Sequence, residues 1–577
     1  MLKTIVTGLL RKRTSPEALN ELGIVKWREG DLSQATRIFR EMIRRYPRFA
    51  PAYGNLGAVL FVQNRFDEAL AVFEEGVALD PEHVSLQTNL AMAYHRGRRI
   101  DKAIAHYRQA LERDPAATAA RSHLLRAYLD GCHWRSAEAM ITRLTERFAQ
   151  RDGGNWQADV SPFVALQISS SAAFQLAVAS YHARHIARAV PAGPVPARPT
   201  VRRREKNARI RLGYLSGDFR EHAVAHQTLP LYGLHDRERF EVFCYSIGPD
   251  DGSVYRRRIA ADADEFVDLT ALSHVDAASK IRHDGIDILI DMAGHSGNSR
   301  PEIPALRPAP VQISYLGYPG TSGASWIDVM VADNAVIPAA LHEHYSERIV
   351  YLPDCYLMAH AGQPVAERPS RRELGLPETG FVYCCFNQSS KITREMFEAW
   401  LEILQQVPGS VLWLYHDNDE ARRCIEAEVA ARDFAVGRVF FAGRVASKAE
   451  HLARYRAADL FLDTFPYTAH ATGCDALWAG LPVLSMAGES FASRVGMSLL
   501  INAGLPELVV TDRDAYVRTA IELGRHPHRV HDCAERLRRR RENCALFDAP
   551  RYVQNLEALF SRLFAGYASR CNRDGPA

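Results

Sequence analysis

Apolar positions in the first 150 residues recur with a helical period, and the whole pattern repeats every 34 residues. The register is held by a small residue at Ala35, Ala69, Ala103 and Ala137, by Leu22, Leu56, Leu90 and Leu124, and by an aromatic residue at Phe39, Phe73 and Tyr107. Pro47, Pro81 and Pro115 follow at the same spacing. This pattern predicts at least three helix pairs that begin near Ser15, and a fourth, degenerate pair from about 116 to 148.

A 34-residue unit with small residues where helices touch and a terminating proline is the tetratricopeptide pattern. Such pairs stack into an α solenoid, here over residues 15–150, whose concave side is an extended surface for a peptide or protein partner. Asn55 and Asn89 lie one repeat apart on the same predicted helix face. They either grip the backbone of a bound peptide or make hydrogen bonds between repeats, and the sequence leaves both readings open.

The pattern changes after residue 150. A helical period without the repeat runs from Trp156 to about Ala187 and ends in a proline-rich stretch, so residues 151–205 are predicted to be a helical extension and linker. Short apolar runs alternating with helical segments then indicate parallel sheets. The runs lie at 209–218, 240–248, 286–294, 381–387, 411–418, 438–445, 460–466, 481–488 and 508–512.

Two doubly wound α/β units follow from these runs, at residues 206–365 and 366–577, with the C-terminal helices in the second unit. Joined near residues 355–375, they would face each other across a cleft. Ligands of such sheets sit at the carboxyl ends of the strands. We therefore expect the chemistry of the chain in the loops that follow the apolar runs.

Composition narrows the class of partner. A formal net charge of +3 in 577 residues is nearly balanced, and no apolar run is long enough to span a membrane. Ten cysteines without a C-x-x-C pair indicate reduced thiols. The sequence predicts a cytoplasmic protein without a nucleic-acid or membrane partner.

Two histidines four residues apart, His222 and His226, follow the first predicted strand. A pair at this spacing is able to bind zinc, but the sequence offers no third ligand and no H-E-x-x-H motif. We expect no metal here.

Polar and cationic residues follow three strands of the second unit. Gln388 and Lys391 precede a helix that begins near Thr393, where unpaired N–H groups favour a phosphate. Lys448, His451 and Arg454 lie on the opening turns of the next helix, with the last two on one face.

The third such stretch is "PYTAHATGCDALWAG" at residues 466–480. His470 and Thr472 stand at a predicted helix start and are placed to contact a diphosphate, and Asp475 is placed to accept from ribose hydroxyls. The competing interpretation is that His470 is a helix cap and Asp475 an ordinary charge in the first turns. The glycine-rich dinucleotide fingerprint and the Walker loop are both absent, which argues against a redox enzyme or an ATPase.

Several stretches together resemble the O-linked N-acetylglucosamine transferases, which with the SPINDLY proteins form glycosyltransferase family 41. They are "LGYLSGDFREHAVAH", "ALRPAPVQISYLGYPGTSG", "YCCFNQSSKI", "VPGSVLWLY", "HATGCDALWAG" and "ESFASRV". The resemblance covers nearly the whole chain. It implies a GT-B fold of two facing Rossmann-like units, and metal-independent, inverting transfer of N-acetylglucosamine from UDP-GlcNAc to Ser or Thr hydroxyls of proteins. No cofactor is implied.

The resemblance also assigns roles to single residues. Gln388, Lys391, His470 and Thr472 would contact the diphosphate, Ala446, Lys448, His451 and Arg454 the uracil, and Asp475 the ribose. Lys391 would stabilise the leaving UDP and His222 would handle the proton or position the acceptor. The loop 317–323, with Pro319, Gly320 and Thr321, would line the acceptor side, with Asp284, Asp287 or Asp291 nearby. Asp417 and Asp419 are expected to be loop charges only.

The chain departs from animal members of the family in three ways. Ala471 stands where they carry a threonine, Ser389 and Ser390 are smaller than their counterparts, and only three or four repeats precede the catalytic half. These differences fit a bacterial member. Two alternatives stay open: a SPINDLY-like transferase that uses GDP-fucose, and a repeat scaffold whose transferase half is degenerate.

Overall fold

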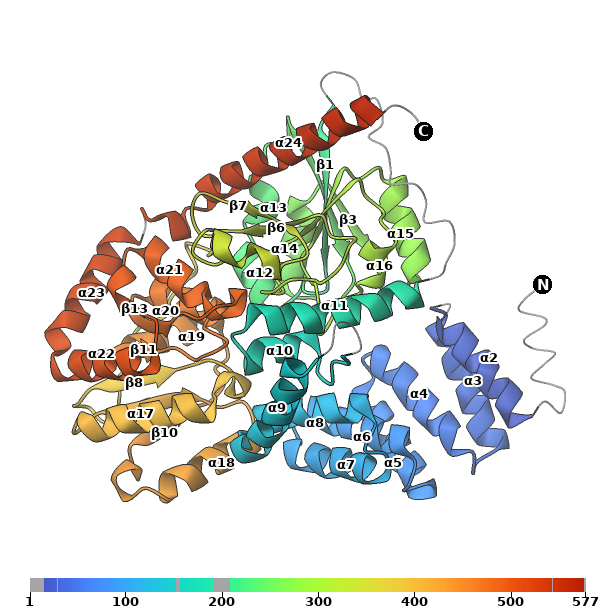
Figure 1. Ribbon diagram of the computed structural model, residues 1–577, viewed down its shortest axis with the longest axis horizontal. Coiled ribbons are helices and arrows are strands. Elements are labelled where there is room, and N and C mark those ends of the chain that lie inside the picture. Colours follow the sequence, from blue (N-terminus) through green and yellow to red (C-terminus); the bar gives the residue numbers. More distant parts are fainter. Residues whose placement is uncertain (1–14, 29, 152–155, 191–207, 542, 575–577) are drawn as a thin grey trace. The chain divides into compact units, whose positions relative to one another are not determined.

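The chain forms two compact units in the computed structural model, which describes residues 15–28, 30–151, 156–190, 208–541 and 543–574 (Figure 1). The first unit holds the repeats up to Met140, and the second holds most of the chain from Ile141 onward. The boundary falls inside the last repeat helix rather than after it. Most of the predicted proline-rich linker lies outside the described residues. No described helix is both long and apolar enough to cross a membrane.

Four consecutive helix pairs form the repeat region, as the 34-residue period predicts. They are α2 (Pro16–Arg28) and α3 (Leu32–Arg45), α4 (Ala50–Val62) and α5 (Phe66–Leu79), α6 (Val84–Arg96) and α7 (Ile100–Arg113), and α8 (Thr118–Asp130) and α9 (Trp134–Ala149). The repeat has a steric basis: a Cβ atom at Gly23 would collide with the Phe39 ring, and one at Gly57 with the Phe73 ring. The first helix of a pair therefore needs a small residue where the aromatic side chain of the second helix packs.

After the end of α9, the second unit holds α10 (Pro162–Ile168) and α11 (Ala172–Ala189) and continues into a seven-stranded parallel sheet with the order β3-β2-β1-β4-β5-β6-β7. Its strands are β1 (Ile210–Ser216), β2 (Phe240–Ser246), β3 (Glu265–Asp268), β4 (Ile288–Asp291), β5 (Val311–Ser314), β6 (Val329–Ala332) and β7 (Arg348–Tyr351). Its helices are α12 (Ala223–Thr228), α13 (Leu231–Leu234), α14 (Val254–Asp262), α15 (His274–His283) and α16 (Glu302–Ala305). This sheet and its helices are called the first lobe.

A six-stranded parallel sheet with the order β10-β9-β8-β11-β12-β13 forms the second lobe. Its strands are β8 (Val382–Cys385), β9 (Val411–Tyr415), β10 (Val439–Ala442), β11 (Leu460–Leu462), β12 (Val483–Met486) and β13 (Val509–Val510). Its helices are α17 (Arg394–Gln406), α18 (Asp419–Ala430), α19 (Lys448–Arg454), α20 (Ala471–Ala479), α21 (Val495–Ala503), α22 (Arg513–Arg525) and α23 (Pro527–Arg540). The central strands are buried along their whole length, because helices pack on both faces of a parallel sheet.

The long last helix, α24 (Ala549–Asp574), corrects the predicted second unit of residues 366–577. It packs on the first lobe: the Glu557 carboxylate bonds the His235 ring at 3.0 Å, and the Tyr552 hydroxyl lies 2.6 Å from that of Tyr315. Figure 1 shows this helix, in red, running beside the green first lobe. The apolar pattern of a C-terminal helix does not show which lobe it packs on. The sequence therefore could not predict that α24 covers the first lobe.

We expect Glu557→Ala to lower the free energy of unfolding by roughly 1–3 kcal/mol. Glu557 is buried and also accepts the Asp236 N–H at 2.8 Å, so its removal leaves the buried His235 ring and the half-buried Asp236 N–H without an acceptor. Denaturant unfolding of the two forms measures the loss. Gln554→Ala, on an exposed position of the same helix, is the control, and an equal loss in both variants would contradict the assigned role.

Candidate active site

Side chains gather at the switch point of the second lobe, where β8 and β11 lie side by side and their following loops diverge. The loop after β8 continues into the short 3-10 helix Ser389–Lys391, and the loop after β11 leads into α20. Ligands of open parallel sheets bind in this crevice. The predicted residues of these two loops, from Gln388 to Lys391 and from His470 to Asp475, therefore share one edge of the sheet.

Lys391 is the cation of this crevice. Its Nζ atom donates to the Thr468 carbonyl at 2.9 Å and lies 3.9 Å from the centre of the Tyr467 ring. Burial lowers the pKa of Lys391 to about 8, and the negative charge of Asp463 opposes that shift. The ammonium group is thus held in place and is still mainly protonated near neutral pH.

Asp463, at the end of β11, organises the loop that holds Lys391. Its buried carboxylate accepts the N–H groups of Thr464 at 2.7 Å and Ala469 at 2.6 Å, and the hydroxyl of Ser485 at 2.6 Å. Burial raises the pKa of Asp463 to about 6. The sequence interpretation missed this residue, although an aspartate directly after the strand "LFL" was a signal that could have found it.

Asp475 is buried on α20 and joins two predicted binding residues of α19. Its Oδ2 atom lies 2.6 Å from Lys448 Nζ and 3.4 Å from His451 Nε2. Burial acts to raise the pKa of Asp475, but the Lys448 and His451 side chains outweigh it and the pKa is lowered. Asp475 is therefore a charged anchor shared by two helices rather than an ordinary surface charge.

Arg454 completes this cluster from the last turn of α19. Its Nη1 atom donates to the Gly443 carbonyl at 2.7 Å, and its guanidinium lies 4.5 Å from the centre of the Phe386 ring. The Nη2 atom lies 2.5 Å from His451 Nδ1, so His451 accepts there and keeps its proton on Nε2, which faces Asp475. The Nε atom of Arg454 is buried without an acceptor among the described residues. Ala446 and Gln388 are exposed at the same edge.

His470 and Thr472 lie at the start of α20, as predicted, but both side chains have partners within the protein. His470 occupies the N-cap position without capping the helix, and its Nε2 atom lies 3.3 Å from the Ala492 carbonyl. Burial and the nearby Lys391 charge hold the pKa of His470 well below its usual range, so the ring is neutral. The Thr472 hydroxyl donates to the Asn387 side chain. The interpretation of His470 as a capping side chain is wrong.

His222 lies at the start of α12, after β1 of the first lobe. Its Nδ1 atom accepts the Val224 N–H at 3.3 Å and lies 3.4 Å from Asp218 Oδ2. Burial lowers the pKa of His222, and Asp218 partly opposes this, so the ring is mainly neutral at neutral pH. A proton on Nδ1 would bond Asp218 and leave Nε2 free to accept one, whereas a proton on Nε2 would make that atom a donor.

The two lobes meet beside this histidine. His226, one turn along α12, bonds Glu221 at 2.6 Å, and burial together with the Lys448 charge lowers its pKa. The charge of Asp475 also reaches His226. Charges on α19 and α20 of the second lobe thus act on α12 of the first, and α12 contacts α20, so the predicted donor side adjoins the helix that begins directly after His222.

The loop after β5 holds the predicted acceptor-side residues. Pro319, Gly320 and Thr321 are buried, and the Thr321 hydroxyl donates to the Glu347 carboxylate at 2.7 Å, so its role here is to fix the loop. Gly320 packs against Leu166 of α10, which also contacts Tyr467. The next residue, Gln167, donates to Ser390 at 3.0 Å. The sequence interpretation treated α10 only as an extension and missed this brace between the lobes.

The prediction that Asp284 lies near the acceptor side is wrong. It precedes β4, its carbonyl accepts from Arg211 at the start of β1, and its carboxylate pairs with Lys280 at 2.5 Å. Asp284 therefore stands at the amino edge of the sheet, opposite to His222. Asp287 likewise accepts the Arg211 N–H at 2.8 Å. Asp291 is at the correct edge, but it is buried and accepts the N–H groups of its own turn.

Two further predictions concern residues outside the cleft walls. Asp417 accepts from Asn418 at 3.0 Å and from Ser389 at 3.3 Å, and Asp419 is an exposed residue in the first turn of α18. In the repeat region Asn55 donates to Asn20 at 2.8 Å, which favours hydrogen bonding between repeats, and Asn89 is half-buried. A role of either asparagine in holding a peptide stays a prediction.

Comparison with known proteins extends the likeness over most of the chain. The family model for Glycosyl transferase family 41 matches residues 131–366 and 361–556, and tetratricopeptide models match residues 20–84, 62–118 and 94–158. Among solved structures, a mutant of the Thermobaculum terrenum O-GlcNAc transferase superposes with a TM-score of 0.70 at 27% identity, covering 96% of this chain and 98% of that one.

Curated relatives are longer proteins. The probable UDP-N-acetylglucosamine–peptide N-acetylglucosaminyltransferase SEC of Arabidopsis thaliana is 34% identical over 445 residues, which are 75% of this chain and 45% of the relative. The corresponding Caenorhabditis elegans enzyme is 28% identical over 555 residues, 76% of this chain and 48% of the relative. The Arabidopsis thaliana SPINDLY protein is 30% identical over 369 residues, 62% of this chain and 40% of its own.

The chain thus spans about half the length of the first two relatives. The family model nevertheless covers both lobes and the end of the repeat region. The two parallel sheets with their shared cleft agree with the fold that the sequence predicts, and with the solved transferase that covers nearly the whole chain. The chain belongs to glycosyl transferase family 41.

Proposed function

We propose that the chain transfers N-acetylglucosamine from UDP-GlcNAc to Ser or Thr hydroxyls of proteins, with inversion and without a metal ion. The observation that carries the proposal is the position of Lys391 at the switch point, beside the first turn of α20. The relatives named as UDP-N-acetylglucosamine–peptide N-acetylglucosaminyltransferases and the solved O-GlcNAc transferase support the donor and the reaction.

The leaving group explains why a cation belongs at this edge. Cleavage of the sugar–phosphate bond leaves UDP with an additional negative charge on its diphosphate, which fixed positive groups stabilise more in the transition state than in the bound substrate. Lys391 supplies a full charge, and the N–H groups at the start of α20 supply partial charges. Gln388 is exposed at this edge and would bond the phosphate oxygens, whereas His470 and Thr472 would first have to give up their bonds to Ala492 and Asn387.

The nucleoside half of the donor would be held on α19 and α20. Asp475 keeps Lys448 and His451 on one wall, and it is also placed to accept from ribose hydroxyls. Two groups could bond a uracil ring. One is the Nε atom of Arg454, which has no acceptor among the described residues, and the other is the backbone of the exposed Ala446. His222, on the opposite wall, would position the acceptor hydroxyl or take its proton.

Protein acceptors would be bound by the repeat region. Stacked helix pairs present an extended surface that suits a segment of polypeptide. This role rests on the tetratricopeptide matches and on the named activities of the relatives.

The donor is tested by calorimetry of the whole chain with UDP, UDP-GlcNAc, UDP-glucose, GDP and GDP-fucose. We expect UDP and UDP-GlcNAc to bind and the two guanosine compounds to bind at least about tenfold more weakly, because groups that bond uracil leave polar atoms unpaired against guanine. Tighter binding of GDP-fucose would instead support the SPINDLY-like alternative, and no binding of any compound would support a scaffold.

Lys391→Ala is expected to abolish transfer while the thermal unfolding midpoint stays close to that of the parent. The pH dependence tests the charge itself: UDP affinity of the parent should fall as pH rises from about 7 to about 9, because Lys391, with its pKa near 8, loses its proton in this interval. The variant should bind UDP more weakly and show no such fall. A flat profile in the parent would remove the ammonium from diphosphate binding.

Asp475→Asn is expected to weaken UDP binding by roughly tenfold to a hundredfold, because the neutral amide no longer holds Lys448 and His451. Calorimetry measures the change. Asp419→Asn, which removes an exposed carboxylate from the same lobe, is the matched control and should bind UDP as the parent does. Equal affinity in all three proteins would refute the assigned role of Asp475.

A further inference from the structure

A large pocket lies at the amino edge of the second sheet, away from the candidate active site. Its volume is about 810 Å³, which is in the usual range of small-molecule sites. Phe381 directly precedes β8, Asp459 directly precedes β11, and Pro482 directly precedes β12, so the pocket faces the opposite ends of the strands from Lys391. Helix α23 forms its other wall.

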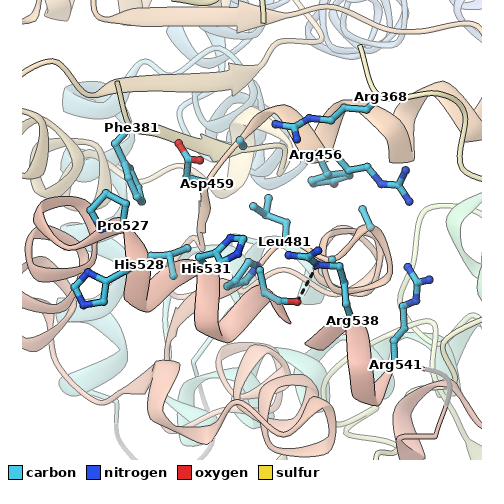
Figure 2. Close-up of a pocket in the computed structure, with 17 residues that line it drawn as sticks. Arg368, Phe381, Arg456, Asp459, Leu481, Pro527, His528, His531, Arg538 and Arg541 are labelled. Atoms are coloured by element: carbon cyan, nitrogen blue, oxygen red, sulfur yellow. Dashed lines mark hydrogen bonds between the residues drawn. The ribbon is translucent and has the colours of Figure 1, made fainter. Parts of the chain in front are cut away.

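Positive charge dominates one half of this pocket. Figure 2 shows Arg368, Arg456, Arg538 and Arg541 on that half, and Phe381 and Pro527 on the other. Asp459 is the one carboxylate of the lining, and it is already used: it accepts from Arg371 at 2.8 Å and from the Val382 N–H at 2.7 Å. None of the four lining arginines forms an ion pair with another residue of the described chain.

The arginines are placed by contacts that leave donors free. Arg541 donates through Nη1 to the Trp478 carbonyl at 2.7 Å and stacks 4.6 Å from the centre of that ring. Its Nε atom is buried without an acceptor among the described residues. Arg538 donates through Nε to the Ala534 carbonyl at 3.3 Å, and its Nη atoms donate to no other residue that the structure describes. Several N–H groups of these side chains therefore remain available to a ligand.

The four charges also act on one another. Burial lowers the pKa of Arg456, and the charges of Arg541, Arg368 and Arg538 lower it further. The like charges of these arginines repel one another, and an anion bound among them would offset the repulsion. Planar guanidinium groups bond phosphate oxygens in pairs, which makes phosphate the anion that suits them best.

We propose that this pocket binds a small soluble molecule that carries more than one phosphate group. Arg456, Arg538 and Arg541 hold the phosphates, and the half formed by Phe381 and Pro527 accepts the remainder of the molecule. A single phosphate would neutralise at most half of the four charges. The site is independent of the proposed transferase reaction, since no lining residue belongs to the cleft between the lobes.

Inorganic tripolyphosphate is the probe, titrated calorimetrically into the whole chain with saturating UDP present so that the cleft is occupied. We expect one molecule to bind per chain, and Arg538→Ala and Arg456→Ala each to weaken binding by about tenfold or more. Arg539→Ala removes the same charge from α23, but Arg539 pairs with Glu535 at 3.0 Å and does not line the pocket, so this control should bind as the parent does.

Three results would overturn the proposal. They are no binding of tripolyphosphate to the parent, an equal loss in Arg539→Ala and Arg538→Ala, and tighter binding of an oligoglutamate peptide than of tripolyphosphate. The second result would show a diffuse surface charge, and the third an acidic protein segment as the occupant. Thermal unfolding of each variant shows that the substituted proteins are folded, and the UDP affinity measured alongside separates this site from the proposed donor site.

Discussion

The buried carboxylate of Asp463 is the interaction on which the second lobe of the structure depends. A buried charge is stable only when hydrogen bonds replace the water around it. The donors to Asp463 are two backbone N–H groups of its own loop, the Asn387 amide after β8 and the Ser485 hydroxyl of β12. The same bonds fix the loop from Thr464 to Ala469, whose Thr468 carbonyl holds Lys391. A side chain at Gly496 would collide with this carboxylate, so the neighbouring helix must carry a glycine there. The site cation is thus positioned by a network that touches no ligand.

Both lobes use the same strand order around their centres, and this symmetry explains why the cleft forms where it does. In each sheet the next two strands lie on one side of the first strand and the later strands on the other side. The loops after β1 and β4 therefore diverge and leave a crevice, as do the loops after β8 and β11. His222 follows one central strand and Lys391 follows the other. Helix α12, which carries His226, contacts α20, so the carboxyl edges of the two sheets adjoin each other here.

Patterns with a strong period were predictable from the sequence, whereas features set by long-range packing were not. Apolar spacing predicted the repeats and the six strands of the second sheet. The strand-end rule then placed Lys391, His451 and Asp475 at one edge of that sheet. Four strands of the first sheet were missed: β3, β5, β6 and β7. β3 is a short edge strand that is only partly buried, and the residues of β7 are exposed or half-buried. β5 and β6 are buried, but each is only four residues long, which is too short for a period to stand out. Asp284 was placed near the acceptor side by the resemblance, although it precedes the run 286–294 and the strand-end rule alone puts it at the amino edge. The brace from Leu166 and Gln167 joins residues more than two hundred positions apart, for which no local signal exists.

The return of α24 to the first lobe has a mechanical consequence. The chain crosses between the lobes twice, once between β7 and β8 and once between α23 and α24, so the second lobe is tethered at both of its ends. A body held at two points swings about the line that joins them and cannot easily twist or slide away. Any movement of the second lobe relative to the first is accordingly restricted to a swing about that line.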